Sequence, residues 1–208
     1  MPASPPTDSP ADAEAANVAD AVNQRSLSLM SRVKTGDETA FAELVTLHQQ
    51  AAVGAAFRML GSLEDAHDVA QQVFVRIWRS APRYEPTAKF TTWMFTILRN
   101  LVFNEQRRRS RQHLQSIEAQ GEAFGHEVED ATTPQPDAGV SQRELEEAVD
   151  RAIQTLPENQ RLAVSLRRGE DLPYEQIAEI MEISLSAVKS LLFRARNELK
   201  EKLKNFLD

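Results

Sequence analysis

Side chains suited to contact with nucleic acid recur along one predicted helix near the C-terminus, between residues 185 and 199. Apolar residues at helical spacing define the buried side of this helix. Its opposite side carries hydroxyl, cationic and amide groups, which donate hydrogen bonds to phosphate oxygens and base edges. These outward residues are Ser186, Lys189, Ser190, Phe193, Arg194 and Asn197. The pattern therefore predicts a DNA-contacting surface.

A short helix and a tight turn precede this surface. Ile177 and Met181 lie on the predicted buried side of the short helix, and the small Ala178 allows a second helix to cross closely. Ser184 ends the turn and can cap the helix that follows. Such a pair of helices presents the second one to a DNA major groove about 12 Å wide. The sequence thus predicts a helix-turn-helix over Leu172 to Leu199.

The composition restricts the fold and the class of protein. Only seven of the 208 residues are glycine, and helix-forming residues dominate, which predicts an all-α fold. The chain has no cysteine, so disulfides and thiolate metal sites are excluded, which fits a reducing cytoplasm. No apolar run reaches the roughly 18 residues of a membrane helix, and the N-terminus lacks a secretory pattern. We therefore expect a cytoplasmic protein without membrane insertion.

Helical periodicity and its interruptions divide the chain into four parts. In the first helical domain, Ser62 is a candidate helix cap with Asp65 three residues later, and a further helix is expected from Thr91 to Arg109. The four parts are a disordered tail over 1–25 with a possible frayed helix over Ala11–Val22, a helical domain over 26–110, a flexible linker over 111–140 and a second helical domain over 141–208.

The net charge of −7 does not exclude nucleic acid, because the charges are unevenly placed. Between Gln112 and Asp150 there are ten acidic residues and one basic residue. Basic residues gather instead just before this segment and on the last helix. Since phosphate binding depends on local basic patches, both helical domains remain candidates for DNA contact.

Each helical domain contains segments that resemble a known family. In the first domain these are Glu64–Trp78 and Lys89–Asn100, and in the second they are Leu156–Arg161 and Tyr174–Ala178. The segments of the first domain resemble conserved region 2 of bacterial RNA polymerase sigma factors, and those of the second resemble region 4. Two such regions joined by a linker are typical of the extracytoplasmic-function (ECF) group of the sigma-70 family.

The resemblance implies partners and roles for individual residues. The partners are promoter DNA, core RNA polymerase through its β′ clamp helices and β flap, and an anti-sigma factor. Residues expected to bind core polymerase are Asp65, Asp68, Gln71, Gln72 and Phe74. Residues expected to bind the −10 element are Tyr84, Lys89, Arg99, Asn100, Arg107 and Arg108. Residues expected to bind the −35 element are Ser186, Lys189, Ser190, Phe193 and Arg194.

Two other classes of protein account for the sequence less well. A stand-alone helix-turn-helix regulator would explain residues 141–208 but not the pattern over 64–100. An enzyme is disfavoured because the four histidines are dispersed and no phosphate loop or nucleophile motif occurs. His67 stands beside two aspartates, but the three do not share one helical face well. We expect no catalytic residue, metal or cofactor, and the sequence leaves open whether the two domains pack together.

Overall fold

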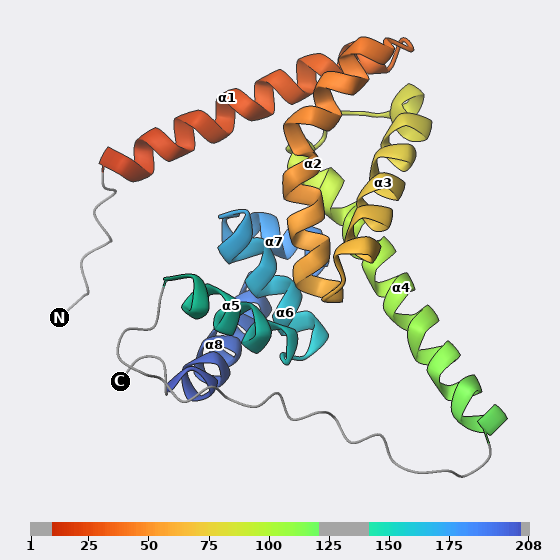
Figure 1. The fold of residues 1–208 in the computed structure, drawn as a ribbon. Helices are drawn as coiled ribbons and strands as arrows, with labels where there is room; N and C mark the ends of the chain where they lie inside the picture. Colours follow the sequence, from red (N-terminus) through yellow and green to blue (C-terminus); the bar gives the residue numbers. More distant parts are fainter. Residues whose placement is uncertain (1–9, 121–141, 205–208) are drawn as a thin grey trace.

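Helices account for almost all of the chain that the computed structural model describes, residues 10–120 and 142–204. Within these two ranges no strand occurs, and the all-α fold class is confirmed. None of the described helices is long and apolar enough to cross a membrane. The elements, shown in Figure 1, are α1 (Pro10–Val33), α2 (Glu38–Leu60), α3 (Leu63–Ser80), the 3-10 turn η1 (Ala81–Arg83), α4 (Phe90–Gln120), α5 (Gln142–Gln154), α6 (Glu158–Val164), the π-helical turn η2 (Ser165–Gly169), α7 (Tyr174–Met181) and α8 (Leu185–Lys202).

Local signals in the sequence place several helix ends. The predicted cap at Ser62 is confirmed, because its side chain accepts a hydrogen bond from the backbone N–H of Asp65 at the start of α3. Ser184 caps α8 in the same way through the N–H of Ala187. Gly61 ends α2 in the left-handed conformation, with φ 72°, which glycine adopts without a steric penalty.

Two helices extend further than their sequence patterns predict. Helix α1 begins at Pro10, inside the segment expected to be a disordered tail, while residues 1–9 lie outside the described residues. Contacts with distant residues hold its second half: Asn23 accepts from the N–H of Phe90, and Ser26 hydrogen-bonds His48. Helix α4 continues to Gln120, into the segment expected to be a linker, of which residues 121–141 lie outside the described chain.

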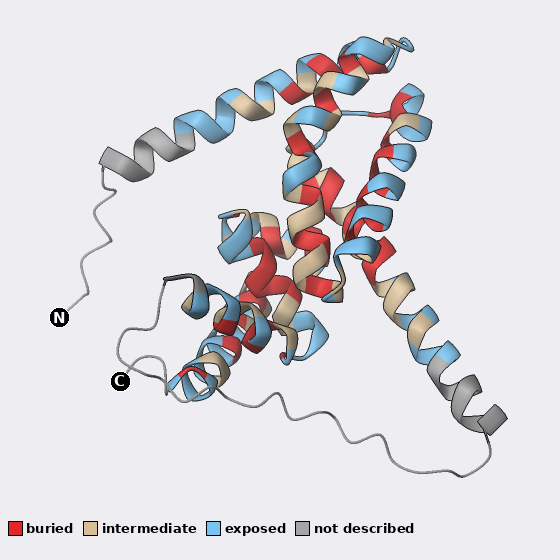
Figure 2. Ribbon diagram, viewed as in Figure 1, coloured by how far each residue is buried: buried red, intermediate tan, exposed pale blue. Residues whose placement is uncertain are grey.

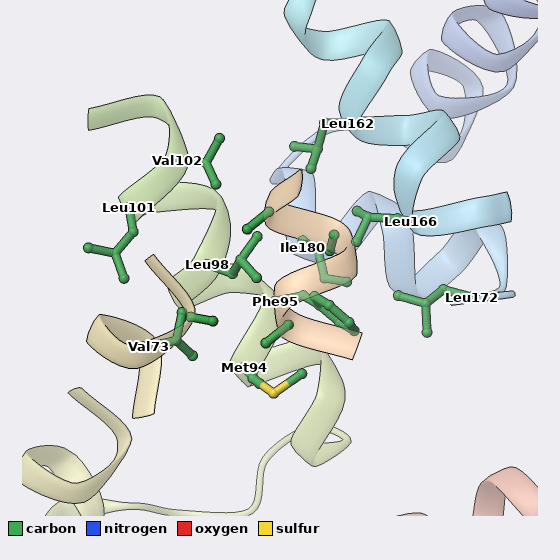
Figure 3. Packing of buried hydrophobic residues seen from close by; sticks show 14 of the residues in the cluster. Val73, Met94, Phe95, Leu98, Leu101, Val102, Leu162, Leu166, Leu172 and Ile180 are labelled. Carbon is green, nitrogen blue, oxygen red and sulfur yellow. The ribbon is translucent and has the colours of Figure 1, made fainter. Parts of the chain in front are cut away.

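One hydrophobic core joins the two helical domains. Helices α1–α4 form the first domain and α5–α8 the second, and α7 packs on α4 while α5, α6 and η2 pack on the C-terminal part of α2. Buried residues are concentrated where these helices meet, as Figure 2 shows. Figure 3 shows Phe95 and Leu98 of α4 close to Ile180 of α7 and Leu166 of η2. The two domains therefore pack together in this structure.

Helix α7 is buried on more than one side because it contacts both domains. Ile177 and Met181 belong to the predicted stripe and are buried, and Met181 also lines a hollow shared with α4. Ile180, which lies outside that stripe, is fully buried against α4. A helix that is apolar on several faces is typically enclosed by its neighbours. Full burial of one such aliphatic side chain contributes about 1.5–3 kcal/mol.

Candidate nucleic-acid interface

The outward face of α8 gathers the five side chains predicted to contact the −35 element. All five are exposed, and the Phe193 side chain is 65% exposed, although large aromatic residues usually pack. The opposite face of the helix is anchored by the buried Val188, Leu192 and Ala195. Among the described residues, neither Lys189 nor Arg194 has an ion-pair partner. The helix is therefore a rigid support for free cationic and aromatic groups.

The two serines of this face are oriented by local hydrogen bonds. Ser190 donates to the backbone oxygen of Ser186 at 2.9 Å, one turn earlier. The hydroxyl of Ser186 lies 2.9 Å from that of the capping Ser184. A hydroxyl can donate one hydrogen bond and accept two, so both serines keep acceptor capacity toward a ligand.

The second cluster of predicted DNA-contacting residues lies on α4. Arg99 does not point freely into solvent: its side chain is only 11% exposed. Its Nη1 donates to the backbone oxygen of Ile180 at 2.5 Å, and its Nη2 to Glu182 Oε1 at 2.8 Å. It also donates to Asn100 Oδ1, at 2.9 Å from Nη2. The turn of the helix-turn-helix thus occupies the guanidinium of Arg99.

Other residues of this cluster line a surface hollow between α4 and α7. The hollow has a volume of about 340 Å³, and it brings Arg99, Asn100 and Arg107 together. Phe103 and Asn104, which are not among the residues predicted from the sequence, lie between them on the same face of α4. Their signal was the spacing of four residues from Arg99 to Phe103 to Arg107, which aligns side chains along a helix.

The two loop residues predicted to bind the −10 element, Tyr84 and Lys89, contact other side chains of the first domain. Tyr84 is only 8% exposed, and its ring packs against Trp93 with the ring centroids 4.6 Å apart. Burial raises the pKa of its hydroxyl above the usual value. Lys89 Nζ forms an ion pair with Asp20 Oδ1 of α1 at 2.8 Å. In this arrangement a base could stack on Tyr84 only after the loop rearranges.

Arginines at the end of the cluster belong to a charge network. Arg108 is paired with Glu105 at 2.7 Å, and Arg109 is paired with both Glu105 and Asp65. Hydrogen bonds from Ser62 and Arg109 hold the pKa of Asp65 below its usual value. The hydrogen bond from Arg108 does the same for the pKa of Glu105. Arg107 remains exposed on the neighbouring face.

A separate apolar groove runs between α2 and α3, with a volume of about 760 Å³. It brings together three of the residues predicted to bind core polymerase: Asp68 and Gln71 at its edge and the largely buried Phe74. Asp65 and Gln72 do not line it. The groove also contains apolar residues of α2, and Trp78 of α3 with its ring 4.9 Å from that of Phe41. These α2 residues are Phe41, Val45 and Val53.

Comparison with known proteins matches each of the two domains to a protein family. Residues 44–112 match the family Sigma-70 region 2, and residues 146–199 match Sigma-70, region 4. The chain is 33% identical to the RNA polymerase sigma-H factor of Pseudomonas aeruginosa, a match covering 86% of this chain and 94% of that protein. It is 34% identical to the ECF RNA polymerase sigma-E factor of Haemophilus influenzae, covering 85% and 94%.

A solved structure agrees with this assignment. The sigma factor RpoE of Bartonella quintana, crystallised with the anti-sigma factor NepR, matches with a TM-score of 0.62 and 26% identity. The match covers 79% of this chain and 96% of that one. Because both regions match in the expected order, a stand-alone helix-turn-helix regulator is not supported. The chain belongs to the ECF group of RNA polymerase sigma factors, the sigma-70 family proteins that direct transcription initiation.

Proposed function

We propose that this sigma factor holds promoter DNA with two separate surfaces, α8 at the −35 element and the α4 cluster at the −10 element. The observation that carries the proposal is the α8 face, where Lys189, Phe193 and Arg194 stand exposed on a helix whose other side is buried. A free guanidinium can bind a guanine edge with two hydrogen bonds, and an exposed aromatic ring can contact a thymine methyl group.

In the −10 element, Asn100 supplies the base-edge contact and the neighbouring arginines bind phosphates. The amide of Asn100 is exposed and carries both donor and acceptor groups, which suits an unpaired base. Arg107 is exposed next to it and can neutralise the backbone of a displaced strand. Stacking on Tyr84 is part of the proposal and requires release of its ring from Trp93.

Core polymerase binds the groove between α2 and α3. An apolar floor with Phe74 and Trp78, edged by Asp68 and Gln71, has the composition of a protein interface with an aromatic centre and a polar rim. The acidic edge favours a partner surface that carries basic residues. We identify this partner surface as the β′ clamp helices, which Asp65 and Gln72 also contact outside the groove. The β flap contacts region 4.

An anti-sigma factor regulates this protein. The support is the relationship to the RpoE of Bartonella quintana, whose structure was solved with the anti-sigma factor NepR. Because core polymerase and the bacterial chromosome share the cytoplasm, the sigma factor acts there. Co-purification of the tagged protein from its native host under non-inducing conditions should yield a protein that blocks transcription in the assay below.

Transcription with purified core polymerase on genomic promoter fragments tests the proposal. Specific initiation should require the protein, and Asn100→Ala should weaken promoter opening. Arg194→Ala should weaken −35 binding by about 1–3 kcal/mol, the cost of losing a two-pronged base contact. Arg151→Ala is the matched control, because it removes the same charge from an exposed position on α5. Unchanged transcription from both Asn100→Ala and Arg194→Ala would remove the residue assignments.

A further inference from the structure

The loop that joins η1 to α4 contains two of the residues proposed to bind the −10 element, Tyr84 and Lys89. Helix α1 packs on both η1 and α4, although it contains none of the residues proposed to contact DNA. Lys34, directly after the end of α1, donates from Nζ to the backbone oxygen of Tyr84 at 3.1 Å. Asn23 of α1 accepts a hydrogen bond from the backbone N–H of Phe90 at 3.0 Å. Two side chains of this segment therefore hold the backbone of the loop at its two ends.

The bond from Phe90 to Asn23 is a helix cap supplied by a distant part of the chain. Phe90 is the first residue of α4, and the first N–H groups of a helix have no acceptor within that helix. An asparagine normally caps a helix from the position just before it. Asn23 instead precedes Phe90 by 67 residues. The direction in which the loop enters α4 therefore depends on α1.

The side chain of Phe90 is also tied to α1. Its ring is fully buried, with its centroid 4.8 Å from that of His48 of α2. His48 in turn shares a hydrogen bond of 2.7 Å with the buried Ser26 of α1. Both the backbone and the ring at this end of the loop are therefore fixed through α1.

Two other contacts of the loop are easily exchanged. Lys89 pairs with Asp20 of α1, but the two side chains are 39% and 67% exposed, and an exposed ion pair contributes little stability. Lys89 can therefore leave Asp20 for a phosphate. Tyr84 packs on Trp93, yet among the described residues its buried hydroxyl has no hydrogen-bond partner, which is unfavourable for a buried polar group. Hydration of this hydroxyl therefore offsets part of the cost of releasing the ring.

We propose that α1 sets the −10 base preference of this sigma factor without touching DNA, with Asn23 and Lys34 as the positioning residues. They hold the loop backbone while the side chains of Tyr84 and Lys89 rearrange onto the DNA. The inference rests on the proposed function of these two loop residues. A mobile surface adapts to several partners, whereas contacts held in one geometry discriminate between them. Loss of an anchor should therefore reduce the preference for one base over another.

Substitutions at the two anchors separate hydrogen bonding from side-chain volume. Asn23→Ala removes the capping acceptor, whereas Asn23→Asp keeps it and places a negative charge at the start of α4, where the helix dipole favours one. Lys34→Met removes the donor but keeps the aliphatic stem, and Lys34→Arg keeps a donor. Asn17→Ala is the matched control, since it makes the same substitution as Asn23→Ala at an exposed position of α1.

Transcription by core polymerase with each variant from a promoter library measures the base preference. The −35 element is kept constant, the −10 element is randomised, and the transcribed promoters are sequenced. At the most selective −10 position, the ratio of the favoured base to the others should fall roughly three- to fivefold in Asn23→Ala, the equivalent of one capping hydrogen bond. It should fall roughly twofold in Lys34→Met, because Lys34 is exposed and water can replace its bond. Asn23→Asp, Lys34→Arg and Asn17→Ala should keep the wild-type ratio.

This ratio distinguishes positioning from a general loss of structure. Partial unfolding lowers transcription from every promoter alike and leaves the ratio between bases unchanged. Amide hydrogen exchange at Phe90 measures the anchor itself, and it should become faster in Asn23→Ala than in Asn23→Asp.

An unchanged ratio in Asn23→Ala or in Lys34→Met overturns the positioning role of that residue. An equal loss of preference in Asn23→Ala and Asn23→Asp, or any loss in Asn17→Ala, overturns the inference as a whole. Lys34 is exposed, so Lys34→Met decides even if Asn23→Ala fails to fold. If the wild-type protein shows no −10 preference, the proposed function is wrong. A wild-type preference that both anchor variants retain removes only the role of α1.

Discussion

The two surfaces proposed to bind DNA carry similar side chains, but they differ in how far those side chains are already bonded to other parts of the chain. On α8, Lys189 and Arg194 are exposed, and among the described residues no carboxylate pairs with them. In region 2, Lys89 is paired with Asp20 and Arg99 with Glu182, while Tyr84 is buried against Trp93. The surface proposed for the −35 element is therefore free, whereas the surface proposed for the −10 element is partly engaged within the protein, with Asn100 and Arg107 exposed beside these paired groups.

The difference follows from how each surface is built. The α8 face is one side of a single helix, whose opposite side supplies all the packing that it needs. The −10 surface combines a loop with one face of α4, and both contact other parts of the chain, α1 on one side and α7 on the other. A surface that neighbouring elements cover must be released before it can bind a ligand, and its release can be regulated.

The largest expected effect is on the free energy of unfolding, when a phenylalanine is replaced by alanine in the shared core and, for comparison, on α8. Phe95→Ala, at a side chain only 1% exposed in the shared core, should lower the free energy of unfolding by about 3–5 kcal/mol. Phe193→Ala, on the open face of α8, should change it by less than about 0.5 kcal/mol and weaken −35 binding instead. Urea denaturation and duplex binding measure the two effects. A large loss of stability in Phe193→Ala would mean that the ring packs in solution.

In the same experiment, tryptophan fluorescence reports region 2, because both tryptophans lie there, while circular dichroism reports all helices. Since one core joins the regions, the two signals should give coincident transitions in the wild-type protein. Separate transitions would show that region 4 unfolds independently and would contradict the packing on which the comparison depends.

A smaller effect is the pH dependence of the free energy of unfolding, to which a buried histidine of region 2 contributes. His48 is 3% exposed, bonded to Ser26 at 2.7 Å, and burial lowers its pKa from 6.5 to about 4. The unfolded state therefore binds the proton more tightly, and stability falls as the pH drops from 6.5 toward 4. Between pH 7 and pH 5 this histidine should cost about 2 kcal/mol. Residues 141–208 contain no histidine, so the effect belongs to region 2.

Urea denaturation of wild type and His48→Gln at the two pH values measures this cost. The glutamine keeps a polar partner for Ser26 but does not titrate, so its stability should fall less than that of the wild type. An equal fall in both proteins would assign the pH dependence to other groups.

The smallest expected effect concerns the two serine caps. Ser62→Ala at α3 and Ser184→Ala at α8 should each cost about 1 kcal/mol of stability, because each removes one capping hydrogen bond. Only Ser184→Ala should also weaken −35 binding, since Ser184 contacts Ser186 on the DNA-facing side. Equal DNA binding by both variants would show that the cap does not orient that face.

The sequence determined what depends on neighbours within one or two helical turns. The spacing of apolar residues predicted the exposed and buried sides of α8, and the caps Ser62 and Ser184 followed from short-range hydrogen bonding. The residue patterns of regions 2 and 4 were enough to indicate the family. These features are local, so the residues that produce them stand close together in the chain.

Only the tertiary structure decided which charged and aromatic groups are free. Arg58 and Glu170 are 112 residues apart, and Arg99 and Glu182 are 83 apart, so no local spacing indicates that they pair. The extension of α1 likewise depends on contacts with α2 and α4, which a pattern poor in large apolar residues could not predict. The burial of Tyr84 and the packing of the two regions have the same cause: both depend on surfaces that form only when distant helices meet.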